Sequence, residues 1–126
     1  MIPNYIESAV AEFGRSAGLA SFAFSERGAA ALKFSFGATL RFEYAMDKLM
    51  VAMTMPCGND EGTMRKILGY SKPPARGAQC VRAGYLAKRA EAIFAVAIPE
   101  RDVTPPAINA AFATLWQIIT EFGGPQ

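Results

Sequence analysis

The chain reads AALKFSFGATLRFEYAMDKLMVAMTM over residues 30–55, and this stretch decides the fold. Large apolar side chains fall on every second residue in three successive runs, which is the spacing that places them on one face of a β-strand. Short turn-forming segments, Gly37-Ala38 and residues 46–48, separate the runs. The stretch therefore predicts an antiparallel meander of three short strands.

One amphipathic helix is predicted on each side of this meander. Asn4 can cap the first, at residues 4–17, and Gly18 follows its end. Thr104, followed by two prolines, begins the last helix, because proline is tolerated in the first turn, and Gly123 ends it. The apolar stripes at helical spacing are Ile6, Val10 and Phe13 in the first helix and Ile108, Phe112, Leu115, Ile119 and Phe122 in the last.

A third, short helix is predicted after the meander. Thr63 is its expected cap, and Gly69 follows its end. Its apolar face is too small to need much of the core, so we expect that face to meet a second subunit. The face consists of Met64, Ile67 and Leu68.

Two further strands complete the predicted order of elements. A loop at residues 71–79, which contains two prolines and a glycine, precedes strands at residues 80–86 and 91–98. The order is α-β-β-β-α-β-β-α, with strands grouped together and not alternating one by one with helices. It predicts a single α+β domain over residues 1–126, with an antiparallel sheet packed by helices.

Composition and charge indicate contact surfaces. The chain is 52% hydrophobic and 19% charged, against about 25% charged residues in ordinary domains, which indicates either apolar surface that a partner covers or simply many alanines. The net charge is +2, but residues 62–89 carry seven basic side chains and no acidic one. Such a segment attracts phosphates, anionic lipid or an acidic protein surface, or else forms a solvated basic loop. Its basic residues are Arg65, Lys66, Lys72, Arg76, Arg82, Lys88 and Arg89.

The residue types of familiar active sites are missing. The chain has no histidine, so neither Cys57 nor Cys80 has a histidine base, and no zinc site, phosphate-binding glycine loop or G-x-S-x-G motif is present. We expect no catalytic residue, no cofactor and no metal. Glu7, Glu12 and Arg15 interrupt any signal-peptide core, and charges interrupt every long apolar run. A cytoplasmic protein with reduced thiols is therefore expected.

Short motifs in the second half of the chain are similar to those of a known family. They are Arg82-Ala83-Gly84-Tyr85-Leu86, the apolar strand that follows, Pro99-Glu100-Arg101-Asp102-Val103-Thr104, and Ala111-Phe112 with Leu115. Together with the order of elements and the length, they resemble the class I chaperones of bacterial type III secretion, which have the CesT-like fold. The SycN-like branch is the most similar. The resemblance covers the whole chain as a pattern and residues 82–115 as sequence.

The resemblance implies a dimeric chaperone that binds the non-globular N-terminal segment of a secreted protein, an effector or a gatekeeper, before export. The client would add a strand to a sheet edge and place its side chains in apolar grooves. Each transferred position also has an interpretation as ordinary core packing. The implied client-binding residues are Ile6, Val10 and Phe13. The implied dimer-interface residues are Ile67, Leu68, Tyr70, Val81, Ala83 and Tyr85.

The basic segment 65–89 departs from the resemblance, because class I chaperones are commonly acidic. In a homodimer, a two-fold axis would bring each basic patch close to its own copy, and like charges oppose association. We therefore expect a heterodimer with a second, acidic small chaperone, which is also what the SycN-like resemblance implies. The alternatives are a homodimer, a basic nucleic-acid-binding protein with Tyr70 and Tyr85 as stacking residues, and an orphan dimerisation module.

Overall fold

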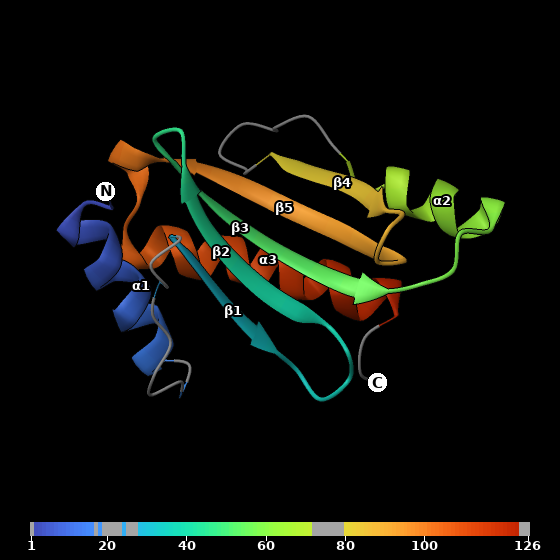
Figure 1. Cartoon of the computed structure of the whole chain (residues 1–126), viewed down its shortest axis with the longest axis horizontal. Helices are drawn as coiled ribbons and strands as arrows, with labels where there is room; N and C mark the ends of the chain where they lie inside the picture. The colour runs from blue at the N-terminus through green and yellow to red at the C-terminus, as the bar shows by residue number, and fades with distance from the viewer. Residues whose placement is uncertain (1, 17, 19–23, 25–27, 72–79, 124–126) are drawn as a thin grey trace.

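The structure is a computed structural model that describes residues 2–16, 18, 24, 28–71 and 80–123. It has the predicted order of elements, with one added 3-10 helix before the last helix (Figure 1). The loop predicted at residues 71–79 falls almost wholly outside the described residues. The elements are α1 (Asn4–Ser16), β1 (Ala29–Lys33), β2 (Thr39–Ala45), β3 (Lys48–Pro56), α2 (Glu61–Leu68), β4 (Val81–Leu86), β5 (Glu91–Pro99), η1 (Glu100–Asp102) and α3 (Pro105–Phe122).

The five strands form one antiparallel sheet in the order β1-β2-β3-β5-β4. Because β5 pairs with both β3 and β4, the two outer strands are β1 and β4. The β2–β3 turn is as tight as the sequence predicts. Met46 and Asp47 have φ values of 53° and 59°, the left-handed conformation that two-residue hairpin turns of type I′ require.

The core lies between one face of the sheet and the helices α1 and α3. In Figure 1, α3 runs behind the sheet and α1 lies on the β1 side. The ring centroid of Phe13 in α1 lies 5.4 Å from those of both Phe42 in β2 and Phe112 in α3, so the three elements meet at aromatic contacts. The predicted α+β architecture is confirmed. Other fully buried side chains are Leu40, Leu49, Val51, Met53, Phe94, Ile108, Leu115 and Ile119.

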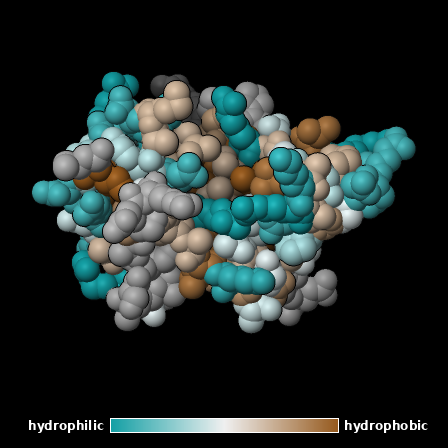
Figure 2. Space-filling view, viewed as in Figure 1, coloured by the Kyte–Doolittle hydropathy of each residue, from teal (hydrophilic) through white to brown (hydrophobic). Residues whose placement is uncertain are grey.

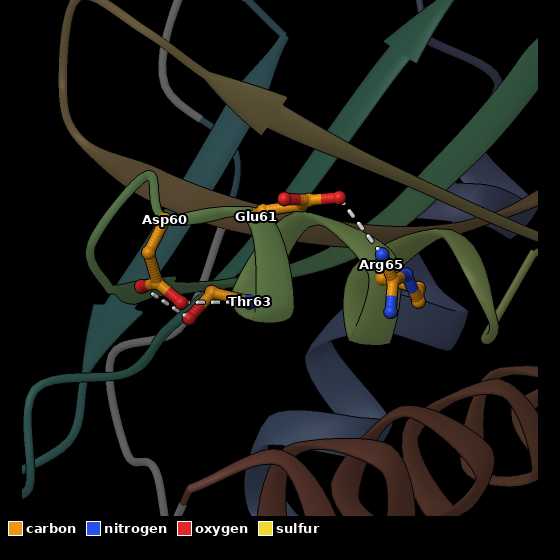
Figure 3. A network of polar contacts seen from close by, with 4 residues as sticks. All are labelled: Asp60, Glu61, Thr63 and Arg65. Atoms are coloured by element: carbon orange, nitrogen blue, oxygen red, sulfur yellow. Dashed lines mark hydrogen bonds and ion pairs between the residues drawn. The ribbon is translucent and has the colours of Figure 1, made fainter.

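The cap of the short helix α2 differs from the prediction. Asp60, not Thr63, is the N-cap residue (Figure 3). The carboxylate of Asp60 accepts hydrogen bonds from the backbone N–H of Thr63 at 3.0 Å and from its hydroxyl at 2.7 Å. Aspartate is the better cap here because its carboxylate satisfies an N–H that the helix leaves without a partner. An exposed ion pair at 2.9 Å joins Glu61 in the first turn of α2 to Arg65 in its last turn.

Candidate functional site

The three side chains predicted to bind a client lie in the core of the described chain. Ile6 and Val10 are fully buried, and Phe13 is 3% exposed. They attach α1 to the sheet and to α3, because burying side chains of this size contributes about 1.5–3 kcal/mol each. A client would have to displace α1 to reach them. Their role as client contacts stays a prediction.

Four half-buried aromatic side chains form a continuous surface between the β1–β2 turn and α3. The ring centroid of Trp116 lies 5.4 Å from that of Phe34, 5.6 Å from that of Phe36 and 5.7 Å from that of Phe112. We call these four residues the aromatic wall. Sequence analysis missed it because the two phenylalanines were predicted as strand residues, whereas β1 ends at Lys33 and they lie in the turn.

Five of the six residues predicted for a dimer interface pack against their own chain. The Tyr70 ring, for example, lies 5.5 Å from the ring of buried Phe94. Leu68 differs, since 65% of its surface is exposed at the end of α2. It alone among the six presents a large apolar side chain that is mostly exposed. The five packed residues are Ile67 and Val81, which are buried, and Tyr70, Ala83 and Tyr85, which are half-buried.

The sheet face opposite the helices holds a groove of about 530 Å³, which we call the sheet groove. Figure 2 shows this face of the sheet, because in the same view of Figure 1 the strands lie in front of α3. Near the centre of the face, apolar residues lie between hydrophilic side chains (Figure 2). Sequence analysis named Arg82 in the basic segment and Cys80 among the thiols, but it did not predict that the lining residues form one surface. The lining residues are Ala45, Met46, Lys48, Met50, Cys80, Arg82, Ala95 and Ala97.

The basic side chains of residues 62–89 do not gather on one element of the described structure. Arg65 pairs with Glu61 on α2, and Lys66 donates a hydrogen bond to the carbonyl of Phe122 at 3.3 Å. Arg82 lies in β4, whereas Lys88 and Arg89 lie in the turn after it. Lys72 and Arg76 are outside the described residues. A nucleic-acid site would need these charges along one surface.

The described residues offer little to catalysis or metal binding. They contain no cluster of three or more potential metal ligands. Burial is the main cause that raises the pKa of the half-buried Cys57 thiol, whereas a catalytic thiol needs a lowered pKa. Within the same part of the chain, no helix is long and apolar enough to cross a membrane.

A five-stranded antiparallel sheet with α1 and α3 on one face defines a small protein of the α+β class. Residues 5–122 match the family model of the type III secretory system chaperone SycN. The chain belongs to this family, as its motifs indicated. Membership of a chaperone family agrees with the prediction of a non-catalytic protein. A search of curated proteins gives no match.

Solved structures with the same fold include chaperone complexes. A chain of the HopA1-SchA chaperone-effector complex has a TM-score of 0.74 at 16% identity, with 94% of this chain and 92% of that chain covered. A chain of the ExsC-ExsE complex has a TM-score of 0.73 at 18% identity, with 93% and 90% covered. A chain of the complex between the Yersinia pestis type III secretion chaperone SycH and a YscM2 fragment has 0.66 at 14%, with 91% and 98% covered. These likenesses confirm the predicted fold.

Proposed function

We propose that the chain binds the non-globular N-terminal segment of a type III secreted protein, an effector or a gatekeeper, and holds it in the cytoplasm before export. We further propose that it does so as a dimer with a second small chaperone. Membership of the SycN chaperone family supports the general role. The similarity to a chain of the HopA1-SchA chaperone-effector complex supports a secreted client.

The aromatic wall is the observation that carries the client proposal. It lies at the end of β1, an outer strand that pairs only with β2 in the described part of the chain. The free edge of an outer strand presents N–H and C=O groups to which a client strand can bind. Alternate side chains of that strand would then cover the half-buried rings of Phe34, Phe36 and Trp116. A client segment with apolar residues at every second position fits this surface.

The second subunit is proposed from Leu68 and from charge. Leu68 is exposed over 65% of its surface, so its side chain is available to a second subunit. Residues 62–89 carry seven basic groups and no acidic one, so an acidic partner complements them better than a second copy does. We therefore favour a heterodimer over a homodimer.

Nucleic-acid binding and an orphan dimerisation role are the alternatives. The first is disfavoured because the described basic residues are divided between α2, β4 and the β4–β5 turn. It predicts affinity for random single-stranded DNA that falls steeply with rising salt. No binding at low salt would exclude it. If the chain were an orphan dimerisation module, a pull-down would recover a partner subunit but no secreted protein.

The test is a tagged pull-down from the native host, in cells that are assembling the secretion apparatus. We expect the wild-type chain to recover the N-terminal part of a secreted protein together with a small acidic protein. Phe36→Ser should lose the secreted protein, whereas Phe122→Ser, a matched change of a half-buried phenylalanine at the end of α3, should retain it. Thermal unfolding of both variants controls for folding. Recovery of neither partner by the wild-type chain would contradict the proposal.

A further inference from the structure

Every second residue of β1 turns its backbone toward the outer edge of the sheet (Figure 1). At one end of the strand, the carbonyl of Gly28 accepts a hydrogen bond from Tyr44 of β2 at 3.0 Å. At the other end, the N–H of Phe34 donates to the carbonyl of Ala38 at 2.8 Å. Hydrogen-bonded pairs alternate along an antiparallel ladder, so alternate residues between these two turn their N–H and C=O groups away from β2. These residues, which we call the β1 edge, are Ala29, Ala31 and Lys33.

The side chains of the β1 edge lie on the face of the sheet opposite α1 and α3, which we call the outer face. Leu32 lies opposite the fully buried core residue Leu40, which places the even-numbered residues of β1 on the helix side. The odd-numbered residues therefore face the other way. A client strand bonded to the β1 edge continues this alternation, whichever way it runs. Half of its side chains meet the aromatic wall, and the other half lie on the outer face.

The outer face is positively charged at one end of the β1 edge. Lys33 is exposed at the end of β1, and half-buried Arg41 of β2 lies opposite Ala31. Within the described part of the chain, neither cation forms an ion pair, and the buried Nε of Arg41 has no hydrogen-bond partner. Ala31 is small and exposed, so a side chain from a strand beside β1 can pass over it toward Arg41. Glu43 lies opposite Ala29, which places negative charge at the other end of the edge.

We propose that the β1 edge selects a client strand with two different faces. Apolar side chains of that strand meet the aromatic wall, and acidic side chains lie on the outer face next to Ala31 and Lys33. Opposite charges on neighbouring strands attract and like charges repel, so Lys33 and Arg41 favour a carboxylate there over a basic group. Glu43 disfavours a carboxylate next to Ala29. The inference rests on the proposed function, because it names the chemistry of the client that binds at the aromatic wall.

The experiment titrates the isotope-labelled full chain with short synthetic peptides and follows the amide resonances of β1 by NMR, which measures weak binding. Both peptides alternate leucine with serine, and two of the serines are replaced by glutamate in one peptide and by lysine in the other. We expect the glutamate peptide to bind about fivefold more tightly. It should also slow hydrogen exchange at the amides of Ala31 and Lys33, which face the edge. The amide of Leu32, which faces β2, is the internal reference.

Charge reversal on the chain provides the matched control. Lys33→Glu with Arg41→Gln changes both cations beside the edge, and Lys88→Glu with Arg89→Gln makes the same net change in the exposed β4–β5 turn. We expect K33E/R41Q to bind the lysine peptide more tightly than the glutamate peptide. K88E/R89Q should keep the wild-type preference, because a contact pair depends on local charge. Equal melting temperatures establish that both variants fold.

Three outcomes would overturn this inference. The wild type could bind the two peptides equally, the two double variants could change the preference equally, or neither peptide could slow exchange at the β1 edge. In each case, recovery in the pull-down of a client that Phe36→Ser loses would leave the chaperone role and the aromatic wall standing. A wild-type chain that recovers no secreted protein would overturn the proposed function and this inference together.

Discussion

The hydroxyl of Tyr44 on β2 donates a hydrogen bond to the carboxylate of Glu100 in η1, although the two residues are 56 positions apart in the chain. The backbone carbonyl of Glu100 accepts a second hydrogen bond, at 2.9 Å, from the hydroxyl of Tyr5 in α1. The backbone N–H of Glu100 donates to the carbonyl of Asp47 at 3.0 Å. One residue therefore joins α1, the β2–β3 hairpin and the β5–α3 connection, and it fixes the end of the molecule where α1 begins.

The Tyr44–Glu100 hydrogen bond predicts a loss of stability in alkali. This bond, assisted by burial and by the charge of Glu100, raises the pKa of Tyr44 from 10.0 to about 12. The folded state therefore binds more protons than the unfolded state in this range, so the contribution is complete below about pH 10 and is lost as the pH rises to about 12. The difference in free energy of unfolding between wild type and Tyr44→Phe, measured in urea, should shrink across this window. A constant difference would contradict the prediction, and Tyr85→Phe controls for the loss of a phenol.

Local patterns predicted the elements, but they did not predict the contacts between distant segments. The alternation through Tyr44 indicates a strand, and the motif at residues 99–104 indicates a link into a helix. Neither pattern shows that Tyr44 and Glu100 meet, because that contact depends on β5 pairing beside β3 and not beside β2. The cap of α2 was predicted at Thr63 because Asp60 and Thr63 can both cap a helix, and the sequence alone does not show at which of them the helix begins.

The candidate surfaces were harder to predict than the core. Helical spacing placed Ile67 and Leu68 on one apolar face, but the 100° between successive helical residues puts only Ile67 against the sheet. The sheet groove was not predicted because residues 91–98 were read as one apolar strand, and the small side chains of Ala95 and Ala97 give no sign of a surface. Whether that surface remains exposed to solvent depends on what binds to it, and the sequence of one chain does not contain this information.

The neighbouring residues Ile67 and Leu68 predict opposite results for the same kind of substitution. Ile67 is 1% exposed, so Ile67→Ala should lower the free energy of unfolding by about 2–5 kcal/mol through lost packing. Leu68→Ala should change it by less than about 0.5 kcal/mol because the side chain is mostly in water. Urea denaturation of the isolated chain measures both values. Equal destabilisation would show that Leu68 packs in the core and would remove it as a candidate contact for a second subunit.

Thr54 predicts a stabilising substitution. Its side chain is fully buried in β3, and its hydroxyl oxygen has no hydrogen-bond partner in the structure as described. Leaving such a group unpaired costs about 1–3 kcal/mol. Valine has nearly the same shape and favours strands, so Thr54→Val should raise the free energy of unfolding by about 1 kcal/mol. Thr39→Val, at the opposite residue on β2, measures the general effect of the exchange. Destabilisation by T54V alone would show that the hydroxyl has a partner.

Asp60 predicts an acid-sensitive helix. Its side-chain and backbone hydrogen bonds with Thr63 lower the pKa of Asp60 below its ordinary value of 3.8, so the cap stabilises α2 above that pH and is lost as the pH falls through the lowered pKa. Because α2 has only eight residues, Asp60→Ala should speed amide hydrogen exchange throughout this helix and leave the sheet unchanged. Asp60→Asn should retain most of the protection, since asparagine also caps helices, but without the dependence on acid. Exchange measured by mass spectrometry at neutral and acidic pH separates the variants. If D60A leaves exchange in α2 at the wild-type rate, packing of Ile67 and not the cap holds the helix that presents Leu68.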